Sequence, residues 1–285
     1  MSSHASTQTY APAVPGTPIG SGGLRQAISD GLIVTGRNLK RVPRIPELAI
    51  LAVLQSIMFV LLFSFVFGGA IPLPGGGSYR EFLMPGIFAQ TIIFASVTTA
   101  IGMTDDVSKG IIDRFRSLPM ARSAVLSGRA MFDLVYNTGI LIVLMLSGLA
   151  VGWRVHSNAP EFFAGVGLLL LFTFAMSWVG VTLGLYVRTV ESANQVGFTL
   201  IFPLTFLSNV FVPPQTLPGW LQPFAEWNPV SALTASIRDL WGNPNPYSTG
   251  GFPAEHSILL TLIWVAVLLA IFMPLGVWRY RSMSR

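Results

Sequence analysis

Six long apolar stretches constrain this chain more than any other feature of its sequence. Each runs for 17 to 24 residues and carries no Lys, Arg, Asp or Glu in its central third. About 20 helical residues cross roughly 30 Å of hydrocarbon, because a helix rises 1.5 Å per residue. A helix in a soluble protein would keep a polar stripe, and these stretches have none. They are residues 48–67, 82–103, 131–151, 162–185, 196–212 and 258–277.

The stretches predict an all-α integral membrane protein with six transmembrane helices. Five reach spanning length, whereas 196–212 is shorter and holds Pro203, so we expect this fifth helix to be kinked or broken. The composition agrees, since 52% of the residues are hydrophobic and only 10% are charged, against about 25% charged residues in soluble domains. The chain has no cysteine, which excludes disulfides, thiolate metal sites and a cysteine nucleophile.

Basic residues are distributed unevenly between the connections, and this predicts the orientation of the chain. The N-terminal segment, the second and fourth connections and the C-terminus together hold fourteen Lys and Arg. The opposite side holds three, Arg80, Arg154 and Arg238. Positively charged loops stay in the cytoplasm, so we expect both termini there, in a multi-pass protein of the plasma membrane. The basic residues flank apolar spans, which points to contact with anionic membrane lipids and not to nucleic acid.

Two segments precede the first span. Residues 1–23 hold no Lys, Arg, Asp or Glu and are rich in Ser, Thr, Ala, Pro and Gly, so we predict a disordered tail. Residues 24–45 combine apolar positions at helical spacing with a basic end, which fits either an amphipathic interfacial helix on the inner leaflet or an ordinary surface helix. The apolar positions are Leu24, Ile28, Leu32 and Leu39. We expect residues 46–285 to form the six-helix transmembrane domain.

The cytoplasmic connection at 104–130 is long enough to hold a short helix of its own. Ile111, Ile112 and Phe115 give it an apolar side, and its acidic and basic residues can pair at three- and four-residue spacing. The dipeptide Leu118-Pro119 would end that helix. A short amphipathic helix between two spans is suited to docking on another protein, and a solvated loop with helical salt pairs would show the same residues.

The external connection at 213–257 is rich in proline and aromatic residues. It includes Trp220, Phe224, Trp227 and Trp241, and indole rings favour the boundary between lipid and water. We expect two short helices, at about 219–227 and 230–241. They fit either an aromatic cap at the membrane surface or a gate over an external exit.

Enzyme chemistry is poorly represented. The chain has no Gly-x-x-x-x-Gly-Lys-Ser/Thr loop for ATP, and its three histidines lie far apart. Asp105, Asp106 and Asp113 leave open a magnesium-dependent membrane enzyme, although basic residues interleave with them. An ion-coupled secondary transporter is a further alternative, but the spans offer neutral polar groups and no central charge. Asp133 lies at a membrane edge, where we expect it to pair with Arg129.

Three stretches resemble the type-2 ATP-binding-cassette transporter permeases, and among them the daunorubicin-resistance permeases of actinobacteria. They are Glu-Phe-Leu-Met-Pro-Gly-Ile at 81–87, Lys-Gly-Ile-Ile-Asp-Arg-Phe-Arg-Ser-Leu-Pro-Met-Ala-Arg at 109–122, and the Pro-rich, Leu-Pro-x-Trp, Asn-Pro segment at 211–229 followed by Arg238. The resemblance covers residues 24–278. It implies a bacterial permease that moves an amphipathic drug, antibiotic, lipid or glycoconjugate outward and is not itself an enzyme.

The resemblance also implies partners and sites. Two copies of a separate ATP-binding subunit would bind ATP and Mg, this chain would bind no cofactor or metal, and a second permease copy would complete a homodimer or heterodimer. Residues 24–45 would be the interfacial helix. The coupling loop for the ATP-binding subunit would comprise Lys109, Gly110, Asp113, Arg114, Phe115, Arg116, Leu118, Pro119 and Met120. The external gate segment would comprise Pro213, Pro214, Leu217, Pro218, Trp220, Trp227, Asn228, Pro229 and Arg238.

Overall fold

The computed structural model describes residues 35–36, 46–67, 78–111, 122–211, 213–246 and 251–283. Within these ranges the chain forms helices and turns and no strand, so the predicted all-α class is confirmed for the described part. The disordered tail expected at 1–23 lies outside the described residues. So does the predicted interfacial helix at 24–45, apart from two helical residues, Thr35 and Gly36.

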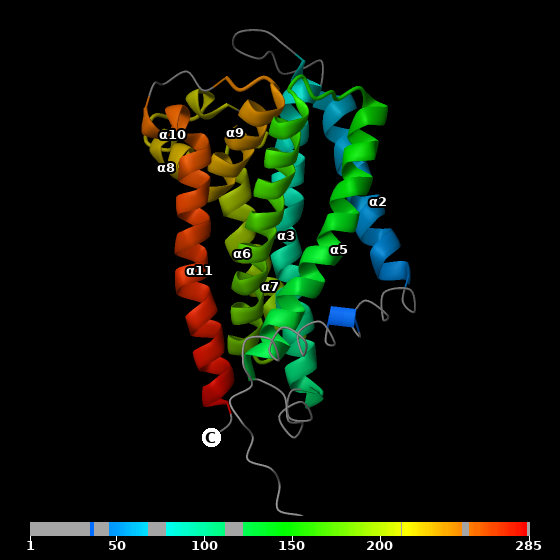
Figure 1. Cartoon of the computed structure of the whole chain (residues 1–285), viewed down its shortest axis with the longest axis vertical. Helices are drawn as coiled ribbons and strands as arrows, with labels where there is room; N and C mark the ends of the chain where they lie inside the picture. Colours follow the sequence, from blue (N-terminus) through cyan, green and yellow to red (C-terminus); the bar gives the residue numbers. More distant parts are fainter. Residues whose placement is uncertain are drawn as a thin grey trace, which may run out of the picture.

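Long helices run side by side along the longest axis of the molecule (Figure 1). They are α2 (Pro46–Leu62), which continues into a π-helical turn at Phe63–Phe67, α3 (Tyr79–Ser108), α5 (Arg122–Val151), α6 (Ala159–Tyr186), α7 (Val190–Phe206) and α11 (Ser257–Ser282). Short helices gather at one end, which we call the α9 end: a 3-10 turn at Pro214–Thr216, α8 (Gln222–Trp227), α9 (Pro229–Trp241) and α10 (Phe252–Glu255). The opposite end, where α3 and α11 finish, is the connection end (Figure 1).

Four of the described helices are long and apolar enough to cross a membrane. They are Tyr79–Ser108, Leu126–Val151, Ala159–Tyr186 and Ser257–Ser282. The first predicted span is also helical, and the fifth is helical past Pro203 as far as Phe206 and then forms turns, but α2 and α7 have 17 residues each. At 1.5 Å per residue, such a helix is about 25 Å long, which is less than the roughly 30 Å hydrocarbon core. The number six therefore stays a prediction.

Local sequence signals explain where several helices begin and end. The side chain of Asn158 accepts a hydrogen bond from the Glu161 amide at 3.0 Å and so caps α6. Thr189 caps α7 in the same way, through the Ser192 amide. Both satisfy amides that the first turn of a helix leaves without a partner. Gly242 ends α9 at a φ of +66°, a left-handed conformation that only glycine adopts at little cost.

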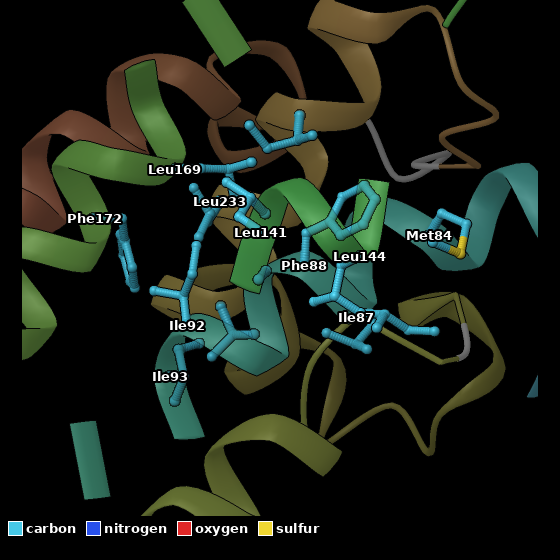
Figure 2. Packing of buried hydrophobic residues seen from close by; sticks show 14 of the residues in the cluster. Met84, Ile87, Phe88, Ile92, Ile93, Leu141, Leu144, Leu169, Phe172 and Leu233 are labelled. Atoms are coloured by element: carbon cyan, nitrogen blue, oxygen red, sulfur yellow. The ribbon is translucent and has the colours of Figure 1, made fainter. Parts of the chain in front are cut away.

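The core is built around α3, which contacts α6 most extensively and also packs against α7, α9 and α5. Gly180 and Gly184, one helical turn apart on α6, lie directly against the α3 backbone at Ser96 and Ala100. Small residues at four-residue spacing allow helices in lipid to approach closely. Figure 2 shows part of the apolar cluster that α3, α5, α6 and α9 form together. Its labelled members are Met84, Ile87, Phe88, Ile92, Ile93, Leu141, Leu144, Leu169, Phe172 and Leu233.

Large apolar side chains also cover the outside of the bundle. Leu146 of α5, Leu200 of α7 and Ile271 of α11 are all more than half exposed. A soluble protein of this size would not expose so much apolar surface. The outer faces of these helices are suited to contact with lipid chains.

Candidate functional site

Helix α9 is inserted among the long helices and does not lie on the surface of the bundle. It packs against α3, α6 and α11, and its side chains from Val230 to Arg238, together with Trp241, are buried. Only Asp239 is exposed. The two predicted short helices at 219–227 and 230–241 correspond to α8 and α9, so their positions are confirmed. Their depth was left open by the sequence, and the structure places α9 inside.

Hydrogen bonds follow the path of this segment into the bundle and back. The side chain of Gln215 donates to the Pro246 carbonyl, which lies just beyond the end of α9. At Trp227 the backbone carbonyl accepts a 3.0 Å hydrogen bond from Trp264, seven residues into α11. The chain then returns along α11, because Ser236 contacts Thr261 at 2.9 Å and Asp239 accepts from Ser257 at 2.7 Å. Residues 213–246 thus enter the bundle and return, and we call this segment the re-entrant hairpin.

Arg238 is the most unusual residue of the hairpin, because its guanidinium is completely buried. Its Nε donates to the Phe82 carbonyl of α3 at 2.9 Å, and one terminal nitrogen donates to the carbonyls of Asn209 (3.0 Å) and Val210 (3.3 Å). The guanidinium also lies 3.6 Å from the centroid of the Phe82 ring, as a close cation–π contact. One side chain of α9 therefore holds both α3 and the turn after α7.

The sequence did not reveal that Arg238 is buried. We counted it among the three basic residues of the external connections, with no statement of its exposure. In the structure, backbone carbonyls and an aromatic face replace the water that would otherwise solvate the charge. The surrounding run Ser-Ala-Leu-Thr-Ala-Ser at 231–236 carries the signal that we missed, since small and hydroxyl side chains are typical of packed helices in membranes.

Asn228 joins α7 to α9. Its side-chain oxygen accepts from the Val230 amide at 2.8 Å and caps α9, whose first residue is Pro229. Its side-chain nitrogen donates to the carbonyls of Leu204 (2.7 Å) and Leu207 (3.1 Å) at the end of α7. The last carbonyls of a helix have no partner within it. The side chain of Asn228 thus supplies hydrogen-bond partners both to the last carbonyls of α7 and to the first amides of α9.

The remaining residues of the predicted gate segment divide into two groups. Pro213 and Pro214 are buried and Leu217 is partly buried, whereas Pro218 is exposed. On α8 and just before it, Trp220, Phe224 and Trp227 are all more than half exposed. The segment therefore combines an inserted helix with an outward-facing aromatic surface, and the cap and the gate both stay predictions.

Sequence reasoning also missed contacts that fasten the α9 end. His156 Nε2 lies 2.9 Å from Glu81 Oε1, which joins the α5–α6 connection to α3. Trp153 and Trp241 pack edge-to-face at 5.3 Å, and each is hydrogen-bonded through its indole nitrogen, to Asn243 and to the Phe162 carbonyl. The sequence did not predict these pairs, because the partners are far apart in the chain.

At the connection end the structure describes only the borders of the predicted coupling loop. Lys109 pairs with Asp105 at 2.6 Å, and Gly110 has a φ of +65° where α3 ends. Thr35 donates to the Gly128 carbonyl of α5 at 3.0 Å. The other coupling positions, Asp113, Arg114, Phe115, Arg116, Leu118, Pro119 and Met120, lie outside the described residues, as do Leu24, Ile28, Leu32 and Leu39.

A charged cluster joins α3 and α5 just inside this end. Arg129 lies 3.4 Å from Asp133 and 3.5 Å from Asp106, and Thr99 donates to Asp133 at 2.9 Å. The predicted pairing of Asp133 with Arg129 is confirmed. The same contacts oppose a magnesium site, because Asp105 and Asp106 each have a basic partner. No group of three His, Asp or Glu that could hold a metal occurs among the described residues.

Comparisons with known proteins agree with this architecture. The family model for the ABC-2 type transporter matches residues 31–240. The chain is 31% identical to the daunorubicin resistance ABC transporter permease protein DrrB1 of Streptomyces coeruleorubidus, over 90% of this chain and 87% of that protein. It is 25% identical to the probable doxorubicin resistance ABC transporter permease protein DrrC of Mycobacterium tuberculosis, over 85% and 84%. The inner membrane transport permease YadH of Escherichia coli is 24% identical over 65% and 72%.

Proposed function

This chain belongs to the ABC-2 type transporter family, and from that premise we propose that it is the transmembrane permease of an ATP-driven exporter of amphipathic molecules, with anthracycline-like drugs as the first class to test. The observation that carries the proposal is the similarity over nearly the whole chain to permeases named for daunorubicin and doxorubicin resistance. The bundle has the apolar outer faces that a membrane permease needs. The magnesium-enzyme alternative finds no support in the cluster at Asp105 and Asp106.

In the proposed topology the connection end faces the cytoplasm and six helices cross the membrane. Helix α2 and its π-helical turn together have 22 residues, from Pro46 to Phe67. The last turn of α11 carries Arg279 and Arg281, at the same end as Lys109. With Arg238 buried, Arg80 and Arg154 are the only Lys or Arg left among the connections expected outside, so the charge asymmetry becomes stronger.

ATP and Mg would act through a separate ATP-binding subunit that engages residues 109–120 from the cytoplasm. These residues connect α3, which lies at the centre of the bundle, to α5. A subunit that moves this connection therefore acts directly on the central helix. The predicted interfacial helix would lie beside it, since Thr35 contacts Gly128 near the start of α5.

The exposed surface of α7 is the observation that favours a second permease copy. One side of it packs on α3, with Gly197 against Val97. The other side exposes Asn194, Gln195 and Thr199, and one turn further Phe202 and Phe206, whose rings stack at 4.3 Å. Amide side chains facing lipid are costly. We place a second copy of the chain, or a sister permease, across this face, so that a polar and aromatic surface lines a path for an amphipathic molecule.

The re-entrant hairpin would close that path at the external side. It follows α7 directly and is fixed to α3 through Arg238. The exposed rings of Trp220 and Phe224 would lie at the boundary of the outer leaflet, where aromatic side chains are favoured. Opening would require the hairpin to move relative to α3.

Transport by inverted membrane vesicles tests the proposal. The chain is co-expressed with a candidate ABC ATP-binding subunit, and uptake of doxorubicin is followed by fluorescence. We expect uptake that needs ATP hydrolysis and persists when ionophores collapse the ion gradients. Uptake that follows a proton or sodium gradient without ATP would instead support an ion-coupled transporter and refute the proposal.

Charge reversal tests the docking site. We expect Arg114→Glu with Arg116→Glu to abolish co-purification of the ATP-binding subunit and ATP-dependent uptake. Arg154→Glu is the matched control, because it reverses an exposed charge at the α9 end, and it should retain both. Unchanged association and uptake in the double variant would contradict docking at 109–120.

A further inference from the structure

We propose that Arg129 is a positioning residue that locks the ends of α3 and α5 together, so that a push on the connection between them moves both helices as one unit. The inference rests on the proposed function, which places an ATP-binding subunit against that connection. It concerns a cluster of four side chains, Arg129, Asp106, Thr99 and Asp133. This cluster lies outside the three stretches that carry the family resemblance.

The cluster spans two helices with one guanidinium at its centre. Arg129 belongs to the early part of α5, and its side chain lies between Asp106 of α3 (3.5 Å) and Asp133 of α5 (3.4 Å). Thr99 of α3 donates a hydrogen bond to the second oxygen of Asp133 at 2.9 Å. Asp133 is thus held from both helices. Each charged group of the cluster contacts an opposite charge that is fixed in place by the helix backbone.

Burial makes these contacts stronger than surface ion pairs. The side chains of Arg129 and Asp106 are 15% and 17% exposed, and that of Asp133 is 6% exposed. Exposed ion pairs contribute little, because water and salt screen them. A buried pair is screened much less, and removing one partner leaves the other charge without compensation. The helix ends therefore separate only if buried charges lose their partners.

Gly102 brings the arginine close to the α3 backbone. A Cβ atom built on this glycine would overlap the guanidinium of Arg129. Any side chain at position 102 would therefore displace Arg129 from its place between the carboxylates. The missing side chain of Gly102 thus leaves the space that the guanidinium of Arg129 occupies across the interface.

The rest of the α3–α5 interface is sparse. Helix α3 packs far more extensively against α6 and α7 than against α5. Helix α5 also packs on α6, and at this end Leu126 and Ala130 lie in an apolar cluster with Met103 and Trp178. The connection at 109–121 leaves α3 and enters α5, so a force on it could separate the ends of these two helices although both pack on α6. A charged bridge at 99, 106, 129 and 133 opposes that separation near the point where the force enters.

Distances between spin labels test the lock directly. The chain has no cysteine, so labels at Ser108→Cys on α3 and Met131→Cys on α5 are unique; both parent side chains are exposed. In the complex with its ATP-binding subunit, we expect one narrow distance distribution that is the same without nucleotide and in the vanadate-trapped state. Arg129→Gln should broaden the distribution or make it differ between the two states. Arg129→Lys, which keeps the charge, should restore most of the parent behaviour.

The same complexes report coupling through the ratio of doxorubicin transported to ATP hydrolysed. We expect Arg129→Gln to lower this ratio roughly tenfold, the factor that corresponds to about 1.4 kcal/mol, while ATP hydrolysis and association of the subunit persist. The double variant Arg129→Gln with Asp133→Asn removes the arginine together with the more deeply buried of its two carboxylates. This double variant should fold well and should still transport less doxorubicin per ATP hydrolysed than the parent.

Arg279→Gln is the matched control at the same end. Its guanidinium donates to the Leu185 carbonyl and so joins α11 to α6, which do not border the connection. It should leave label distances and transport ratio at parent values. Parent-like distances in both Arg129→Gln and the double variant would overturn the inference and leave the proposed function intact. A parent complex that hydrolyses ATP without exporting doxorubicin would overturn the proposed function, and the label distances would still decide whether Arg129 joins the helices.

Discussion

Replacing Arg238 with methionine tests whether the re-entrant hairpin depends on a single buried cation. The substitution keeps a long, flexible side chain of similar shape and removes every hydrogen bond of the guanidinium. The carbonyls of Asn209 and Val210 lie in the turn after α7 and would lose this donor. The Phe82 ring would lose its cation.

The expected cost follows from these contacts. Three hydrogen bonds from a charged donor contribute roughly 1.5–3 kcal/mol each, and a desolvated cation–π contact adds about 2 kcal/mol. Desolvation of the charge offsets several kcal/mol of this gain. We therefore expect a net loss of about 3 kcal/mol in the free energy of unfolding, since each buried carbonyl left without a donor costs about 1–3 kcal/mol.

Thermal unfolding of the purified protein in detergent measures this loss. At roughly 2–4 °C per kcal/mol for chains of about this size, Arg238→Met should lower the Tm by about 6–12 °C. Arg154→Met is the control, because Arg154 is exposed and also donates to backbone carbonyls, of Leu149 and Trp153. We expect it to change stability by no more than about 0.5 kcal/mol, as is usual for surface substitutions. Equal Tm values for the parent and Arg238→Met would refute the anchoring role.

Two further substitutions probe helix packing and helix ends. Gly184→Leu should prevent close packing of α6 on α3, because a Cβ atom at position 184 would lie 2.5 Å from the Ala100 carbonyl oxygen. The variant should therefore lose the monodisperse peak in size-exclusion chromatography. Gly167 has open space around it, so Gly167→Ala should elute like the parent. Asn228→Ala should lower stability by about 1 kcal/mol for the lost cap, and more for the two α7 carbonyls left without a donor. A Tm equal to that of the parent would show that water replaces this side chain.

The sequence predicted the long helices well, because lipid imposes a simple length rule on them. Apolar stretches at 82–103, 131–151, 162–185 and 258–277 lie inside α3, α5, α6 and α11. The helix ends extend past the apolar runs, since capped and charged turns continue the helix beyond the hydrocarbon. Asp133 and Arg129 were found for a related reason, as four-residue spacing on a helix brings two side chains together.

The hairpin was only half predictable. The helix expected at 230–241 matches α9, which begins one residue earlier, but hydropathy does not indicate its depth. A helix with Ser231 and Arg238 looks like a surface helix until the partners of these two residues on other segments are known. Those partners, Asn209 and the Phe82 carbonyl, are 22 and 156 residues away in the chain. Burial of polar groups depends on such long-range pairing, which residue types alone do not encode.

The location of the 109–121 connection tests the central claim most directly. Because the chain has no cysteine, Ser117→Cys in this connection and Gly219→Cys before α8 provide single reactive sites. A membrane-impermeant maleimide added to intact cells should label the cysteine at 219 and leave the one at 117 unlabelled until the membrane is opened. Labelling of the cysteine at 117 from outside would place the proposed docking site beyond the reach of an ATP-binding subunit and contradict the account.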